Sequence, residues 1–184
     1  MHRICVYLGS REGASPQHRQ QAEALGTAIA ERGWGLVYGG ARAGLMGALA
    51  DAALAAGGEV VGVIPQVLVR NEKAHTGLTR LIEVADMHER KAQMAALADG
   101  FVTLPGGIGT LEELFETWTW QYLRFHAKPI AVLDSDGFYA PLLEFLDRTV
   151  EAGFLDADTR ARLISEREIT PLLDRLAPSS GEQA

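Results

Sequence analysis

The sequence has a single cysteine and no long apolar run. Cys5 cannot form a disulfide within the chain, and such an isolated cysteine is typical of a reducing compartment. No stretch of about 18 apolar residues is present to cross a bilayer, and the N-terminus lacks the basic and apolar segments of a secretory signal. These absences predict a cytoplasmic protein without a membrane partner.

Positive charge is also scarce, since 17 lysines and arginines stand against 24 aspartates and glutamates, for a net charge of -7. Non-specific binding to nucleic acids depends on cationic side chains that neutralise phosphates, so no nucleic-acid partner is expected. The 184 residues, 47% of them hydrophobic, suffice for one well-buried core but not for two domains of ordinary size. We therefore predict a single domain over residues 1–177 and a disordered tail over residues 178–184.

Short apolar runs alternate with helix-like segments from one end of the chain almost to the other. Strands are expected at residues 4–8, 35–38, 60–64, 81–84, 101–104 and 130–133, and helices at residues 17–32, 44–56, 87–98, 110–124 and 139–151. Because the apolar runs are continuous rather than alternating, they predict a parallel α/β sheet covered on both faces by helices. Ligands of such sheets bind at the carboxyl ends of the strands, near a switch in strand order.

The most informative segment joins a glycine-rich turn to a helix. It reads Pro105-Gly106-Gly107-Ile108-Gly109-Thr110, and it lies between an apolar run and a long amphipathic stretch. The first-turn amides of a helix lack internal acceptors and lie at the positive end of the helix dipole, so they favour an anion. Glycines let the main chain approach such a ligand because no Cβ stands in the way. The pattern predicts a phosphate site on the amides of residues 107–110.

Glu113, just after this turn, has two interpretations. Thr110-Leu111-Glu112-Glu113 fits the Thr-x-x-Glu capping box, in which the carboxylate closes onto the amide of the first residue. Alternatively, a carboxylate one turn beyond a phosphate-binding loop reaches a ribose attached to that phosphate. The neighbouring Glu112 is expected to face solvent or a partner subunit.

A second glycine turn also follows a strand and opens a helix, and it reads Gly39-Gly40-Ala41-Arg42-Ala43-Gly44. It does not match a P-loop, because Leu and Met follow Gly44 where Lys and Ser or Thr are required. It does not match a dinucleotide fingerprint either, since the next strand ends in Ile64-Pro65-Gln66 without an acidic residue. We expect Gly39 and Gly40 to contact another part of the ligand; the alternative is that these glycines only permit a tight turn and close helix packing.

A third segment, Asp86-Met87-His88-Glu89-Arg90-Lys91-Ala92-Gln93-Met94, predicts a helix that begins at the same sheet edge. Its Asp-x-x-Glu spacing resembles a capping box, so the helix starts at Met87. Met87, Arg90 and Lys91 share one helix face. An arginine in this place can hold a phosphate or carboxylate bidentately, whereas the alternative is that both cations extend to solvent. His88 has no partner with metal-ligand spacing.

Two motifs together resemble those of the LONELY GUY (LOG) family, the cytokinin riboside 5′-monophosphate phosphoribohydrolases once mislabelled as lysine decarboxylases. They are Pro105-Gly106-Gly107-Ile108-Gly109-Thr110-x-x-Glu113 and Met87-His88-x-Arg90-Lys91, and the likeness extends from the first strand to Gly153-Phe154. The resemblance implies a Rossmann-like fold, a homodimer and hydrolysis of the N-glycosidic bond of adenosine-type 5′-monophosphates. One departure is Ala41, which stands where the family has a third glycine.

The resemblance also implies that Arg90 and Glu113 are the catalytic residues. As the bond between C1′ and the base breaks, the ribose gains positive charge, which the carboxylate of Glu113 is expected to stabilise. No cofactor or metal is expected. The remaining substrate-binding candidates are Gly107, Ile108, Gly109 and Thr110 for the phosphate, Lys91 and Glu72 in second rank, and Met87, Gly39 and Gly40.

Two other functions stay open. Relatives of this fold resemble carriers of pterin-type cofactors and nucleotide sensors, which bind without turnover, although Arg90 and Glu113 favour catalysis. A lysine decarboxylase requires pyridoxal phosphate on a lysine, and nothing around the three lysines, Lys73, Lys91 and Lys128, indicates such a site.

Trp118, Trp120 and Tyr122 lie on the same predicted helix as Glu113. Their position is compatible with core packing and equally with a dimer interface rich in aromatic side chains.

Overall fold

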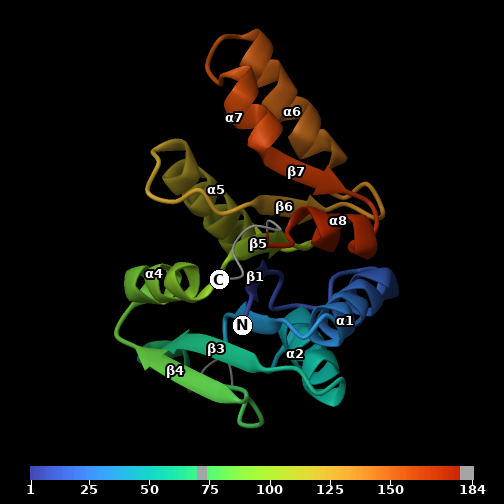
Figure 1. The fold of residues 1–184 in the computed structure, drawn as a ribbon, viewed down its shortest axis with the longest axis vertical. Coiled ribbons are helices and arrows are strands. Elements are labelled where there is room, and N and C mark those ends of the chain that lie inside the picture. Colours follow the sequence, from blue (N-terminus) through green and yellow to red (C-terminus); the bar gives the residue numbers. More distant parts are fainter. Residues whose placement is uncertain (70–73, 179–184) are drawn as a thin grey trace.

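The strands of this chain form one parallel sheet, and helices cover both of its faces (Figure 1). The computed structural model describes residues 1–69 and 74–178. Within these ranges the strands are β1 (Arg3–Tyr7), β2 (Gly35–Tyr38), β3 (Val60–Pro65), β4 (Arg80–Val84), β5 (Gly100–Thr103), β6 (Ile130–Leu133) and β7 (Leu163–Glu166). The helices are α1 (Pro16–Glu31), α2 (Gly44–Ala55), α3 (Gln66–Val69), α4 (Met87–Leu97), α5 (Ile108–Tyr122), α6 (Ala140–Glu151), α7 (Ala157–Arg162) and α8 (Ile169–Arg175). The predicted parallel α/β sheet with helices on both faces is therefore confirmed.

The sheet extends in two directions from its centre. Its strand order is β4-β3-β2-β1-β5-β6-β7, and each pairing of neighbouring strands is parallel. The chain moves outward from β1 to β4 and then crosses back, so that β5 pairs with the other side of β1. Strand order therefore switches between β1 and β5, and a ligand crevice is expected beyond the carboxyl ends of these two strands.

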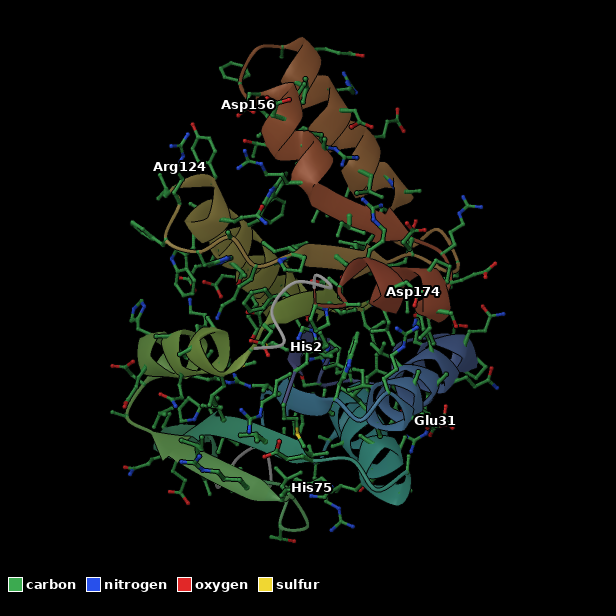
Figure 2. The ribbon with its side chains drawn as sticks, viewed as in Figure 1. His2, Glu31, His75, Arg124, Asp156 and Asp174 are labelled. Carbon is green, nitrogen blue, oxygen red and sulfur yellow. The ribbon has the colours of Figure 1, made fainter. Side chains whose placement is uncertain are left out.

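Two apolar clusters fill the space between the sheet and its helices (Figure 2). On one face α1, α2 and α8 cover the sheet, with Leu25 and Leu49 among the buried side chains. On the other face α4, α5 and α6 contribute side chains such as Met94 and Leu114. The central strands are buried between these layers, which explains why their sequences are continuous apolar runs.

Three of the four elements that the sequence patterns miss lie near the C-terminus, and several helices begin one or two residues from their predicted starts. The sequence patterns do not predict α3, α7, β7 or α8; β7 is an edge strand in which only Leu163 and Ile164 are buried, so its apolar run is too short to recognise. Helix α5 begins at Ile108 rather than at the predicted Thr110. The predicted tail, apart from Pro178, lies outside the described residues. In the described part of the chain we find no helix with the length and apolar content that a bilayer crossing requires.

Candidate active site

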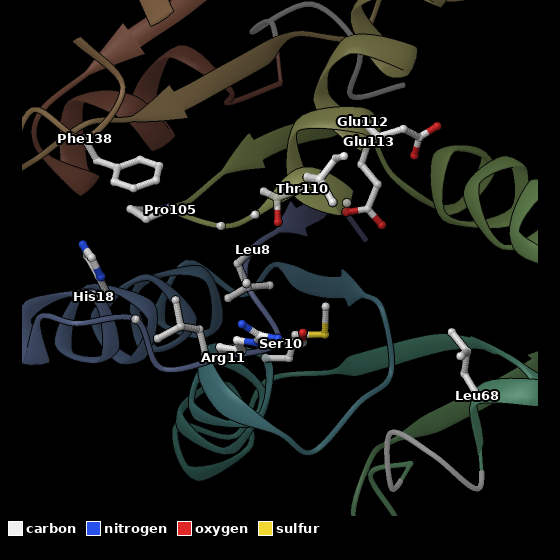
Figure 3. A pocket seen from close by; sticks show the side chains of 18 of the residues that line it. Leu8, Ser10, Arg11, His18, Leu68, Pro105, Thr110, Glu112, Glu113 and Phe138 are labelled. Carbon is white, nitrogen blue, oxygen red and sulfur yellow. The ribbon is translucent and has the colours of Figure 1, made fainter. Parts of the chain in front are cut away.

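A cavity of about 700 Å³ opens at the carboxyl edge of the sheet, where strand order switches (Figure 3). Its walls come from the loop after β1, the starts of α2 and α4, and the glycine turn between β5 and α5. A volume of this size is typical of small-molecule sites. Segments that lie far apart in the sequence thus meet at the sheet edge where a ligand was expected.

The N-terminus of α5 is open to this cavity. Gly107 is its N-cap residue and supplies no side-chain cap, so the first-turn amides have no capping oxygen from that residue and no internal acceptor. A Cβ added at Gly107 or Gly109 would meet no described protein atom within 4 Å, so a ligand can approach the main chain there. Gly106 differs, because a Cβ on it would overlap the buried hydroxyl of Thr110. The turn thus presents exposed amides above a buried threonine.

Glu113 is not a capping residue. Because α5 begins at Ile108, Thr110 occupies its third position and Glu113 its sixth, beyond the reach of the N-cap amide. The capping-box interpretation is therefore wrong, and the reason is that Gly107 rather than Thr110 precedes the first helical residue. The side chain of Glu113 is only 6% exposed, yet it lines the cavity and extends into it beside Thr110 in Figure 3, whereas Glu112 points away.

Two buried side chains of β1, Cys5 and Tyr7, lie close enough to Glu113 to feel its charge. Burial raises the pKa of Cys5 and of Tyr7 well above their usual ranges, and the negative charge of Glu113 adds to both rises. The hydroxyl groups of Tyr7 and Thr117 form a hydrogen bond of 2.8 Å, one helical turn beyond Glu113. Glu113 therefore lies in surroundings of low polarity, where a carboxylate interacts strongly with a developing positive charge.

Arg90 is buried in the wall of the cavity. It is 4% exposed, its Nε donates to the Val63 carbonyl at 3.1 Å, and its Nη2 donates to the Gly39 carbonyl at 2.9 Å. Its Nη1 lies 3.7 Å from the sulfur of Met87. The alternative that Arg90 extends to solvent is therefore wrong, because carbonyls of β3 and of the turn after β2 hold it in place. A guanidinium has five N–H donors, so others remain for a ligand.

Lys91 does not line the cavity. Its side chain is 8% exposed, and its ammonium binds the carboxylate of Glu112 and, at 2.9 Å, that of Glu116. Burial lowers the pKa of Lys91, but the two carboxylates outweigh burial, and the net result is a raised pKa. These ion pairs join α4 to α5, and they thereby connect the helix that carries Arg90 to the helix that carries Glu113.

The glycine turn after β2 faces protein rather than the cavity. Gly39 and Gly40 do not line the cavity, and a Cβ on Gly39 would overlap the guanidinium of Arg90. The Gly40 carbonyl accepts a hydrogen bond from the His75 amide at 3.0 Å. Gly44 has a φ of 57°, and a Cβ on it would overlap the Ser10 carbonyl. The observed contacts of this turn are thus packing contacts.

Of the remaining residues singled out in the sequence, only Met87 lies in the cavity wall among those that the structure describes. Met87 is 39% exposed and lines the cavity. Ala41 is buried in the core and does not have a positive φ, so its methyl group causes no backbone strain. Glu72 lies outside the described residues. Among residues 1–69 and 74–178 we find no cluster of His, Cys, Asp and Glu side chains that would hold a metal ion.

The loop after β1 is the main wall of the cavity that the sequence patterns do not predict. Ser10 and Arg11 line it, and the Gly9 amide donates to the Pro105 carbonyl at 3.1 Å. The available signal is the position of the loop at the carboxyl end of a central parallel strand, where ligands of such sheets bind. No residue pattern within the loop distinguishes it from an ordinary connection.

Known proteins resemble this chain in sequence over most of its length. A family model described as "Possible lysine decarboxylase" matches residues 46–176. A cytokinin riboside 5′-monophosphate phosphoribohydrolase of Rhodococcoides fascians is 48% identical over 167 residues, which cover 90% of this chain and 84% of that protein. The cytokinin riboside 5′-monophosphate phosphoribohydrolase LOG of Oryza sativa subsp. japonica is 45% identical over 179 residues, which cover 96% of this chain and 74% of that protein.

Solved structures share the fold at lower identity. The molybdenum cofactor binding protein of Rippkaea orientalis has a TM-score of 0.71 and 22% identity, over 95% of this chain and 94% of that one. The molybdenum cofactor carrier protein of Chlamydomonas reinhardtii also has a TM-score of 0.71, with 20% identity, over 95% of this chain and 97% of that one. At these identities the likeness shows the architecture alone.

Proposed function

This chain belongs to the LONELY GUY family of cytokinin riboside 5′-monophosphate phosphoribohydrolases, and we propose that it hydrolyses the N-glycosidic bond of adenosine 5′-monophosphates with or without an N6 substituent. Water adds to C1′ of the ribose, the bond to the base breaks, and the free base and ribose 5-phosphate are released. The observation that carries this proposal is one cavity that joins the open N-terminus of α5 to the buried side chains of Glu113 and Arg90.

The 5′-phosphate is assigned to the start of α5. The amides of Gly107, Ile108, Gly109 and Thr110 lie at the positive end of the helix dipole, and the Thr110 hydroxyl supplies a further donor. The phosphate does not take part in the bond cleavage. Its binding energy therefore serves to hold the ribose where the reaction occurs.

Glu113 is assigned to the reacting carbon. As the bond from C1′ to the base lengthens, the ribose becomes oxocarbenium-like, and a carboxylate in surroundings of low polarity stabilises this charge. The same carboxylate can accept a proton from the attacking water, and general-base catalysis of this kind contributes about 10²- to 10⁴-fold in rate. The departing base takes up a proton, which balances the reaction.

Arg90 is assigned to oxygen atoms of the ribose or phosphate. The carbonyls of Val63 and Gly39 already hold its guanidinium, so its remaining donors are fixed before a ligand arrives. Met87 supplies an apolar part of the wall, which suits a purine base. Glu72, outside the described residues, stays a second-rank candidate for substrate binding.

A homodimer in the cytoplasm is the further part of this proposal. Trp118 is buried in the core, whereas Tyr122, Phe125 and Phe154 are 54%, 74% and 89% exposed. Aromatic side chains are enriched in protein interfaces, so this exposure supports self-association. Size-exclusion chromatography with light scattering is expected to give twice the 19.9 kDa mass of the chain, and a monomer would contradict the proposal.

The activity is tested by incubation of the purified protein with AMP and with N6-isopentenyl AMP, followed by chromatography of the products. We expect free base and ribose 5-phosphate in equal amounts, and the ratio of the two rates reports the preferred base. A protein that binds either nucleotide but releases no base would overturn the proposal and favour the carrier function.

A further inference from the structure

Arg11 is a cation in the cavity wall that no other described residue engages. Its side chain is exposed, and within residues 1–69 and 74–178 it forms neither a hydrogen bond nor an ion pair. Arg90, in contrast, is buried and donates to two backbone carbonyls. As far as the described residues are concerned, all five of its N–H donors are therefore available to a ligand.

The loop that carries Arg11 is fixed between two neighbouring turns. The Gly9 amide donates to the Pro105 carbonyl at 3.1 Å, which places this loop beside the turn that precedes α5. On its other side the main chain of Gly44 approaches so closely that an added Cβ would overlap the Ser10 carbonyl and crowd the Arg11 amide. The position of Arg11 is thus set by main-chain contacts on both sides.

Arg11 faces the proposed phosphate site across the cavity. Figure 3 shows Ser10 and Arg11 on the wall opposite Thr110 and Glu113. Because the carboxylate of Glu113 also extends into the cavity, an anion bound at α5 benefits from a cation that offsets its charge. A guanidinium suits this purpose, since it is always charged and binds phosphate bidentately.

We propose that Arg11 binds the 5′-phosphate from the side opposite α5 and makes the site selective for phosphorylated ribosides over free nucleosides. This rests on the proposed function, because it takes the ligand to be a nucleoside 5′-monophosphate. The main chain of α5 supplies neutral N–H donors, which donate to uncharged oxygen atoms as well. Arg11 adds the full positive charge that favours a phosphate dianion over a neutral hydroxyl group.

Equilibrium binding tests this role separately from catalysis. Isothermal titration calorimetry compares the wild-type protein, Arg11→Ala and Arg11→Lys, with ribose 5-phosphate and adenine as the two probes. We expect Arg11→Ala to weaken the binding of ribose 5-phosphate about 10- to 100-fold and to change the binding of adenine less than about two-fold. Arg11→Lys should retain part of the phosphate affinity, because it keeps the charge and loses the bidentate geometry.

Arg80→Ala is the matched control. Arg80 is also exposed, its side chain also has no partner among the described residues, and it does not line the cavity, so both affinities should stay unchanged. The proposal is overturned if Arg11→Ala lowers the affinities for both probes equally, lowers the affinity for adenine alone, or changes neither affinity. It is also overturned if the wild-type protein does not bind ribose 5-phosphate. Failure of the proposed function gives a different result, namely binding of both probes without release of adenine from AMP.

Discussion

The two glycine turns of this protein look alike in sequence but approach different partners. Each follows a buried strand and leads into a helix at the same edge of the sheet. After β5, a Cβ on Gly107 or Gly109 would meet open space, whereas after β2, a Cβ on Gly39 or Gly44 would overlap protein atoms. A glycine turn therefore indicates that something comes close to the main chain, but not whether it is a ligand or another part of the chain.

The contacts of the turn after β2 give it an indirect role in the cavity. It holds the guanidinium of Arg90 through the Gly39 carbonyl, and it abuts the loop of Arg11 through Gly44. The turn after β5 instead leaves its amides open. Substitutions in the two turns should therefore change stability and ligand binding in different ways.

The largest expected loss of activity comes from a substitution in α5, the helix that follows the open turn. Glu113→Gln keeps the shape of the side chain but removes the charge and the proton acceptor, so kcat for AMP hydrolysis should fall about 10²- to 10⁴-fold with little change in KM. Glu112→Gln is the control, because Glu112 binds Lys91, and the loss of this partly exposed ion pair should lower kcat by less than about tenfold. Equal steady-state kinetics for Glu113→Gln and the wild type would show that Glu113 has no catalytic role.

The next largest effect should come from the turn after β2. In Gly39→Ala the new methyl group overlaps Nη2 of Arg90, so the guanidinium or the turn must move. Overfilling a packed site costs about 1–3 kcal/mol of unfolding free energy, and displacement of Arg90 should lower kcat/KM by about tenfold or more. Urea denaturation and steady-state kinetics measure the two losses. A variant that retains both properties would show that Gly39 does not restrain Arg90.

Gly109→Ala should change stability in the opposite direction. Alanine is favoured over glycine inside a helix by about 0.5–1 kcal/mol, and no described protein atom lies within 4 Å of the added Cβ, so the melting temperature should rise. The methyl group enters the space assigned to the phosphate, and the affinity for ribose 5-phosphate should fall about tenfold. A lower melting temperature with unchanged affinity would mean that the two turns do not differ as described.

Ala41→Gly should have the smallest effect. Ala41 is fully buried without a positive φ, so loss of its methyl group removes core contacts and adds freedom to the unfolded chain, at a cost of about 1 kcal/mol. Because Ala41 does not line the cavity, the rate of AMP hydrolysis should not change. An increased rate would show that a third glycine in this turn serves catalysis.

The sheet and its functional edge were predictable because a strand that is buried on both faces has a continuous apolar sequence. β2 and β6 are unbroken apolar runs, and their residue ranges match the predicted ones. The start of α5 was not predictable from spacing, since Thr110 and Glu113 have the separation of a capping box. Gly107, not Thr110, takes the N-cap position, and nothing in the capping-box pattern distinguishes the two.

The surroundings of the charged side chains depend on contacts between distant parts of the chain, so local patterns could not supply them. Arg90 is held by carbonyls that belong to β3 and to the turn after β2. Lys91 shares a predicted helix face with Arg90, yet it pairs with Glu112 and Glu116 outside the cavity. Arg11 follows no periodic pattern, and its position comes from contacts of its loop with two other turns.

Cys5 lies in the central strand of the sheet, near Glu113, and its reaction with a thiol reagent can measure the opening of the sheet without an engineered cysteine. It is the single thiol of the chain, and burial raises its pKa well above the usual range. Since the thiolate is the reactive form, a thiol reagent modifies this cysteine only when β1 separates from its neighbours. The modification rate under native conditions therefore reports the free energy of that separation. A nucleotide bound in the cavity should slow the reaction by the amount that it stabilises the closed sheet.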